Sequence, residues 1–282
     1  MDLLERLNND IKSLPTLPTI FDSISQTLKD PMLTPEKLAG VIATDQASVV
    51  KVLRVANSPF YGFRGKIDTI TKAVFCLGFK EVQNLIFALA VMNLFSQDKI
   101  IKGFHPKDFW RHSISVGIIS RFIAAASGEK ALENFFLAGV LHDIGKLIFM
   151  EFAFEEYKKV VEYAKSNNVS IKKAEFEIFG FDHTNVGKLI AEKWKLPLTF
   201  INSIHYHHVG MAGNDPDKTV ACVHIADITS KLLSHGNSGD EVVQEPNPKV
   251  WELLNIPSGY FSSMRINIRE DFENTIGSIF DN

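Results

Sequence analysis

The sequence has few cysteines, no long apolar run and no basic, apolar leader. Its two cysteines, Cys76 and Cys222, lie in apolar surroundings, which favours buried thiols in a reducing compartment over a disulfide framework. The longest apolar run, residues 85–92, is far shorter than the roughly 20 residues that cross a bilayer. Residues 1–6 are polar and partly acidic, unlike a signal peptide. We therefore expect a cytoplasmic protein that does not bind membranes.

The chain also lacks an excess of charge of either sign. It carries 30 Lys and Arg against 33 Asp and Glu, a formal net charge of −3. No basic field is available for non-specific binding to phosphate backbones, so we do not expect nucleic acid as a partner. At 282 residues with 45% hydrophobic side chains, the chain has enough apolar surface for a large core.

Helical periodicity dominates the sequence, with proline and glycine at the breaks and no sustained strand alternation. The fold class predicted is all-α, with many helices. Residues 1–100 are expected to form an N-terminal helical subdomain and residues 101–235 a helical core. Residues 236–282 are expected to form a helical tail that packs on this core. Residues 71–95 are expected to form a helix, a glycine turn and a second helix, which is the order of a DNA-binding helix-turn-helix motif. The second helix has almost no basic residues, so we do not expect this pair to bind DNA.

The polar residues that stand out are histidines and aspartates set in apolar helical sequence. Histidine is uncommon, with nine in the chain, and five of them belong to a set of seven candidate metal ligands: His112, His142, Asp143, His183, His207, His208 and Asp227. A buried carboxylate such as Asp143 or Asp227 is costly unless a cation compensates its charge, and a metal ion supplies one. The sequence therefore predicts a convergent metal centre.

Each candidate has a simpler interpretation when taken alone. A single buried histidine such as His112 is more often a hydrogen-bonded core residue than a ligand. Asp182, beside His183, could merely cap the helix that follows, and the adjacent histidines 207 and 208 could simply be solvated. The remaining histidines, at positions 105, 205, 224 and 235, we interpret as structural or surface residues.

The order of these residues resembles a known constellation. His112, the pair His142-Asp143 and Asp227 match the pattern of the HD superfamily of metal-dependent phosphohydrolases. His183 and the pair 207–208 resemble its HD-GYP branch, whose members hydrolyse cyclic di-GMP on two or three metal ions. In that branch the lysine at the position of Lys146 faces phosphate. The Gly-Tyr-Pro segment of the branch is missing, and Val209 stands where a glutamate is expected.

The first half carries a second, more specific resemblance. Residues 14–18, 42–46, 52–62 and 70–78 are similar to the HDOD domain, the HD-related output domain of bacterial signalling proteins. This likeness extends over about residues 10–235. It implies an all-helical fold and a signalling or regulatory role.

The two resemblances together imply a particular site. Imidazole nitrogens and carboxylate oxygens without cysteine suit Fe, Mn, Co or Zn, and two ions are expected. Asp143 would bridge them, with His112, His142 and Asp227 on one side and the histidines at 183, 207 and 208 on the other. Water held between such ions falls in pKa from about 15.7 to about 7. Asp143 and Lys146 are the expected catalytic residues, with Lys146 offsetting charge on phosphate oxygens.

Two functions are consistent with these residues. The first is a metal-binding signal-transduction module that acts mainly through contacts with other signalling proteins. The alternative is an active metal-dependent phosphohydrolase or phosphodiesterase on a cyclic dinucleotide or a nucleotide.

Overall fold

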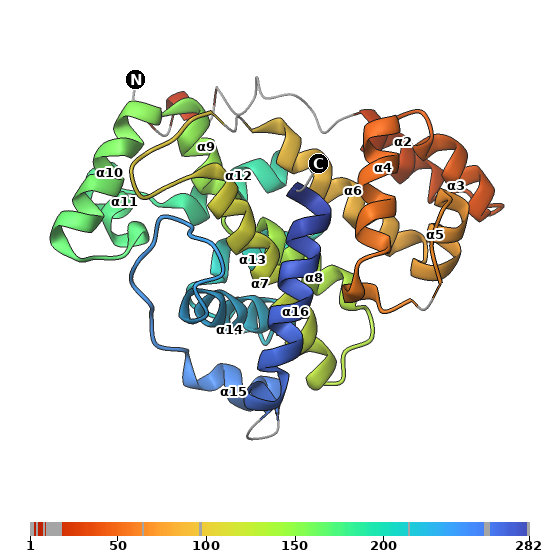
Figure 1. Ribbon diagram of the computed structural model, residues 1–282. Coiled ribbons are helices and arrows are strands. Elements are labelled where there is room, and N and C mark those ends of the chain that lie inside the picture. The colour runs from red at the N-terminus through yellow and green to blue at the C-terminus, as the bar shows by residue number, and fades with distance from the viewer. Residues whose placement is uncertain are drawn as a thin grey trace. The chain divides into compact units, whose positions relative to one another are not determined.

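The computed structural model describes residues 3, 5–7, 9, 19–63, 65–95, 98–213, 215–256 and 260–280. Every regular element among these residues is a helix (Figure 1). The strand-like pairings in this part of the chain are two isolated bridges, Ile101 with Phe104 and Ala212 with Asp215. The predicted all-α class is therefore confirmed. Residues 14–18, which carry part of the family resemblance, lie outside the described residues.

The helices pack into two compact units. One comprises residues 1–14 and 95–260, and the other comprises residues 15–94 and 261–282. The chain thus passes between units at Leu94 and Phe95, and the segment expected to be one C-terminal tail is divided between them. The boundaries predicted near residues 100 and 235 stay predictions.

The unit built from residues 15–94 and 261–282 contains the helices of the first half and the last helix. Their bounds are α2 Thr19–Thr27, α3 Pro35–Ile42, α4 Gln46–Ala56, η1 Pro59–Tyr61, α5 Ile70–Leu77, α6 Phe79–Leu94 and α16 Tyr260–Phe280. Thr34 and Thr69 begin α3 and α5 as N-caps, each accepting a hydrogen bond from a backbone N–H in the first turn. In α16, Ile268, Phe272 and Ile276 are buried at a spacing of four, so one face of this helix is packed.

Gly78, at φ +90°, separates α5 from α6, and the two helix axes differ by 116°. Among the described residues no single helix is long and apolar enough to cross a membrane. The bent pair α5 and α6 meets the length and composition criteria only when both helices are counted together.

The Asn57 side chain holds together the loop that follows α4. Its amide nitrogen donates to the carbonyls of Leu53 (2.7 Å) and Ile67 (2.6 Å), and its oxygen accepts from the Ile67 N–H (2.8 Å). Tyr61, half-buried in η1, donates its hydroxyl to the buried carboxylate of Glu81. The segment around Asn57 therefore has a structural role, because this side chain satisfies both backbone groups of Ile67, which lies outside the helices.

The larger unit contains α7 Pro106–Ala126, α8 Leu132–Leu141, α9 Ile144–Phe152, α10 Phe154–Asn167, α11 Ile171–Phe179, α12 His183–Lys193, α13 Leu198–Tyr206, α14 Lys218–Leu232 and α15 Pro248–Leu254. Helix α7 packs against both α8 and α14, and α12 packs against both α9 and α13 (Figure 1). Most of the core is here, and α7, α8, α9 and α14 are buried along most of their lengths.

Glycines allow the closest approaches between these helices. A Cβ atom on Gly139 of α8 would lie 2.6 Å from the Cα of Gly117 in α7. A Cβ atom on Gly145, in the first turn of α9, would lie 1.9 Å from the carbonyl oxygen of His183 in α12. Only residues without a side chain fit such crossings. The contacts bring together the helix ends that carry the predicted ligands.

Candidate metal centre

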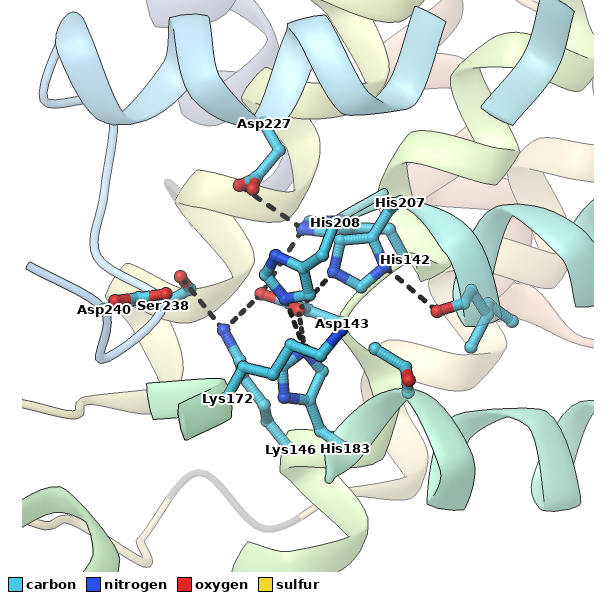
Figure 2. Close-up of polar contacts among 12 residues, drawn as sticks. His142, Asp143, Lys146, Lys172, His183, His207, His208, Asp227, Ser238 and Asp240 are labelled. Atoms are coloured by element: carbon cyan, nitrogen blue, oxygen red, sulfur yellow. Dashed lines mark hydrogen bonds and ion pairs between the residues drawn. The ribbon is translucent and has the colours of Figure 1, made fainter. Parts of the chain in front are cut away.

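The structure brings all seven predicted ligands together in the larger unit. They come from the middle of α7, the junction of α8 and α9, the start of α12, the end of α13 and the middle of α14: His112, His142, Asp143, His183, His207, His208 and Asp227. Figure 2 shows the histidines at 142, 183, 207 and 208 pointing toward Asp143. All are at most 1% exposed except His208, which is half-buried.

Asp143 is common to two groups of ligand atoms. Asp143, His183, His207 and His208 form one group, and His112, His142 and Asp143 form the other, with the atoms of each group within 4.8 Å of one another. Asp227 extends the second group, since its Oδ1 lies 3.0 Å from His112 Nε2 and 3.7 Å from His142 Nε2. A metal ion in either group would therefore have Asp143 among its ligands.

The spacing of the ligand atoms fits a metal. Asp143 Oδ1 lies 3.2 Å from His183 Nε2 and 3.4 Å from His207 Nε2. Asp143 Oδ2 lies 3.3 Å from His142 Nε2. Ligand atoms about 2.1 Å from a shared ion are about 3.0 Å apart in octahedral geometry and about 3.4 Å apart in tetrahedral geometry. The observed separations fall in this range.

Three of these buried atoms have no hydrogen-bond partner among the described residues. They are His142 Nε2, His207 Nε2 and Asp143 Oδ1. These atoms lie near one another, but their geometry is not that of hydrogen bonds. A buried polar atom without a partner lowers the stability of the folded state. Metal bound at the two ligand groups would satisfy all three atoms, so the residues present fit a metal centre.

The second ring nitrogen of three histidines is held in place. His142 Nδ1 donates to the Gly139 carbonyl (2.7 Å), and His207 Nδ1 donates to the Ile204 carbonyl (2.9 Å). His183 Nδ1 donates to the Glu175 carboxylate (2.6 Å). A proton fixed on Nδ1 leaves the Nε2 lone pair directed into the site, as in histidines that bind metals.

Glu175 supports the site, although it is not among the residues predicted from the sequence. It lies in α11 with no exposed surface. Besides the His183 ring, it accepts hydrogen bonds from the His183 backbone N–H (2.8 Å) and from the Tyr157 hydroxyl (2.9 Å). Its only signal in the sequence is its place on the buried face of α11, in line with Ile171 and Ala174.

Lys146 lies beside Asp143, as the resemblance implies. Its Nζ is 2.7 Å from Asp143 Oδ2 and 3.4 Å from the Ser238 hydroxyl, and its side chain is fully buried (Figure 2). Ser238 is a second residue of the site that is absent from the predicted set.

Lys231 makes the corresponding contact on Asp227. Its Nζ is 2.9 Å from Asp227 Oδ2 and 3.5 Å from Asp240 Oδ2. Lys231 follows Asp227 by four residues on α14, so the helical repeat places it on the same face. That spacing is a signal that could have identified Lys231, which is also absent from the predicted set. Asp240 has no such signal, because it lies in irregular chain.

The segment of residues 234–247 crosses this region without regular structure. Ser238 and Asp240 reach the two lysines, Gln244 donates to the His208 carbonyl (3.0 Å), and Asn247 donates to the Val209 carbonyl (2.9 Å). These contacts make the segment part of the wall of the site.

Burial and charge shift the pKa values of the site in opposite directions. Burial lowers the pKa of His142, but Asp143 and Asp227 outweigh it and raise the pKa to about 9. Burial opposes the charged form of His183 too, yet Glu175 and Asp143 raise its pKa to about 9. For His207 burial dominates and lowers the pKa to about 3. Without a metal, the site thus retains protons that a metal would have to displace.

The two aspartates are held in their charged form. Burial would raise the pKa of Asp143, but Lys146 and His142 bring it well below its usual range. Asp227 behaves likewise, with Lys231 and His112 overcoming the effect of burial on its pKa. Both carboxylates are therefore available to a cation at neutral pH.

Comparison with known proteins assigns the fold to a family. The family model of the HDOD domain matches residues 14–209. The chain belongs to the HDOD family. The match agrees with the resemblance found in the sequence, and it covers every predicted ligand except Asp227.

An uncharacterised protein of Treponema pallidum (strain Nichols) is 24% identical over 225 residues, which cover 79% of this chain and 43% of that protein. The chain thus spans less than half the length of this curated relative.

Two solved structures support the fold. An HDOD domain protein of unknown function from Geobacter sulfurreducens is 26% identical, covers 100% of both chains and has a TM-score of 0.81. A candidate phosphohydrolase from Shewanella amazonensis SB2B is 20% identical, covers 97% of this chain and 98% of its own, and has a TM-score of 0.74.

The other histidines of the HDOD protein lie outside the two ligand groups. His105 caps α7 by accepting from the Lys107 N–H. His224 donates to the His207 carbonyl (2.7 Å) and accepts from the Asn247 N–H (3.0 Å). His224 is therefore a structural residue that supports the ligand loop.

Proposed function

We propose that this chain is an HDOD regulatory module that holds metal at the His and Asp cluster and acts mainly through contacts with other signalling proteins. The observation that carries the proposal is a full ligand set that is almost entirely buried. His112, His142, Asp143, His183 and Asp227 are each at most 1% exposed. A bulky nucleotide needs an open approach to its reacting phosphate, and such burial does not offer one.

The residues of this centre have different roles. The histidines bind through Nε2, and Asp143 serves both groups. When bound, a divalent ion acts as a Lewis acid and lowers the pKa of a bound water. Two ions of Fe, Mn, Co or Zn suit these nitrogen and oxygen donors. Lys146 and Lys231 hold the carboxylates in place and offset their charge.

The N-terminal helices supply apolar surface for protein contacts. Phe75 is 82% exposed, Met32 74% and Val50 50%. A groove of about 620 Å³ lies beside α4, lined in part by Val50, Leu53 and Ile67. Scattered apolar side chains are normal on a protein surface, so the apolar lining of this groove is the observation that supports a binding role.

The alternative is a metal-dependent phosphohydrolase or phosphodiesterase acting on a cyclic dinucleotide or a nucleotide. One observation favours it: Lys146 is 2.7 Å from the shared Asp143, where it would meet phosphate oxygens next to the ions. In that case Asp143 and Lys146 are the catalytic residues.

Metal analysis combined with turnover assays separates these functions. The full chain, purified without chelator, is analysed for metal and then assayed with Mn²⁺ or Fe²⁺ against cyclic dinucleotides and nucleotides, beside Asp143→Ala. Bound metal without turnover supports the module. Turnover that is lost in Asp143→Ala supports the enzyme. A chain that binds no metal in aerobic or anaerobic preparations contradicts both.

A further inference from the structure

The charged side chains around the histidines do not cancel. Six of them are joined by direct contacts to the site or to each other: the carboxylates of Asp143, Glu175, Asp227 and Asp240 and the ammonium groups of Lys146 and Lys231. Each side chain is at most 6% exposed. The neighbouring pair of Lys172 and Asp182 is neutral as a pair and more exposed.

Four carboxylates against two ammonium groups leave two negative charges when the histidines are neutral. Neutral imidazole is the form that binds metal. One divalent ion therefore balances the cluster. Two divalent ions leave an excess of two positive charges in a buried region, which is strongly unfavourable without a counter-ion.

The ammonium groups of Lys146 and Lys231 are not spread evenly between the two sets of metal ligands. Lys146 contacts Asp143 Oδ2, the oxygen that faces His142. Lys231 contacts Asp227, whose other oxygen faces His112. Lys231 therefore lies on the side of His112 and His142, whereas Lys146 holds the shared Asp143 and its charge also reaches His183.

The other group has the opposite environment. Asp143 Oδ1 faces His183 and His207, and the carboxylate of Glu175 lies behind His183. This group also offers four ligands, enough for a tetrahedral ion. A first ion is favoured here by the carboxylate of Glu175, and repulsion from Lys231 falls on a second ion in the group of His112 and His142.

We propose that the cluster binds one divalent ion by itself, between Asp143, His183, His207 and His208, and takes a second ion only together with a small dianion such as phosphate. The inference rests on the proposed metal centre and deepens it, because occupancy of the second position becomes dependent on an oxyanion. Lys146 and the Ser238 hydroxyl, 3.4 Å apart, are the donors that an anion beside Asp143 would meet.

Equilibrium dialysis of the metal-free full chain against Mn²⁺ tests the proposal. Metal per chain is measured at a fixed free Mn²⁺ concentration and constant ionic strength, in chloride and in chloride with inorganic phosphate. The expected result is about one ion per chain in chloride and about two with phosphate, from the charge balance of buried ions. Phosphate bound per chain, measured in the same samples, rises with the second ion.

Two variants change the buried charge in opposite directions. Lys231→Met removes a positive charge, so the second ion is expected to bind in chloride roughly tenfold more tightly or better. Asp240→Asn removes a negative charge with little change of shape, so even the first ion is expected to bind roughly tenfold more weakly in chloride and to recover with phosphate. Lys172→Met, which removes a lysine 32% exposed, is the matched control and keeps the behaviour of the original chain.

The outcomes separate this inference from the proposed function. Two ions bound in chloride alone, or one ion in both buffers, overturn the anion dependence and leave the metal centre intact. No ion in either buffer overturns the metal centre itself. Equal effects of Lys231→Met and Lys172→Met show that buried charge does not set the occupancy.

Discussion

The Nδ1 atom of His183 lies 2.6 Å from Oε2 of Glu175, and the same oxygen accepts the backbone N–H of His183 at 2.8 Å. One buried carboxylate therefore fixes both the main chain and the ring of a candidate ligand. A carboxylate behind a metal-binding histidine orients the ring and raises its basicity.

Replacing Glu175 with Gln should weaken metal binding about 10–100-fold, the usual cost of losing such a partner. The amide keeps the size of the side chain but removes the negative charge. Isothermal titration with Mn²⁺ measures the change. Glu177→Gln, on the exposed side of the same helix, is the control, and equal affinities for the two variants would show that Glu175 does not support the site.

Asp143→Ala should abolish binding at both ligand groups, because Asp143 is the residue that they share. His105→Ala removes an exposed helix cap and should leave metal content unchanged. The sequence alone suggests that His235→Ala is harmless as well. In the structure His235 is 9% exposed and its Nδ1 lies 3.0 Å from the Ser115 hydroxyl, so it is a structural residue outside both ligand groups. Retention of metal by Asp143→Ala, measured by elemental analysis, would refute the bridging position.

Metal affinity should rise with pH and level off above about 9. His142 and His183 have pKa values raised to about 9, so both hold protons at neutral pH in the metal-free chain. A metal must displace these protons, and binding should release about one for each histidine. Asp143 stays ionised across this window and releases none. Titrations in buffers of different ionisation enthalpy measure the release, and a pH-independent affinity would contradict the protonated state.

Metal should raise the melting temperature, although for a different reason than the sequence suggests. From the sequence, two aspartates in an apolar interior would repel each other without metal, but in the structure each is paired with a lysine. The stabilisation then comes from binding of the metal to the folded state, and it is about 4 kcal/mol when the free metal concentration is a thousand times Kd. For a unit of this size that is a rise of roughly 8–16 °C. Identical melting curves with Mn²⁺ and with chelator would argue against a metal site.

Gly145→Ala should disrupt the site through its packing. The added Cβ would meet the His183 carbonyl oxygen at 1.9 Å, so α9 and α12 must move apart. We expect a loss of about 3 kcal/mol or more, at the upper end for overpacked cores, together with loss of metal. Gly40→Ala, in α3 with open space around it, should be neutral or gain up to about 1 kcal/mol. Urea unfolding of both variants checks the contrast.

The sequence predicts the helices well because their periodicity and their caps are local signals. The periodicity of residues 46–56 predicts a helix with the same bounds as α4, and Asp182 caps α12, in agreement with one interpretation of that residue. The close approach of Gly145 to the backbone of His183 has no such local signal. No local pattern reveals which distant backbone a glycine will face.

The candidate ligands can be found in the sequence because histidine and aspartate are conspicuous in apolar helices. Their partners cannot be found in the same way. Glu175 and Asp240 lie in other elements than the ligands that they support, and charged residues are usually solvated. Their burial depends on how α11 and residues 234–247 pack, which is a property of the whole unit.

Anomalous X-ray diffraction from crystals of the full chain grown with Mn²⁺ and phosphate tests the central claim most directly. We expect a peak among Asp143, His183, His207 and His208, with bonds of roughly 2.0–2.3 Å to the ligand atoms. A second peak is expected beside His112 and His142, with phosphate density next to Lys146. Crystals soaked in Mn²⁺ that show no anomalous peak within this cluster would contradict the account.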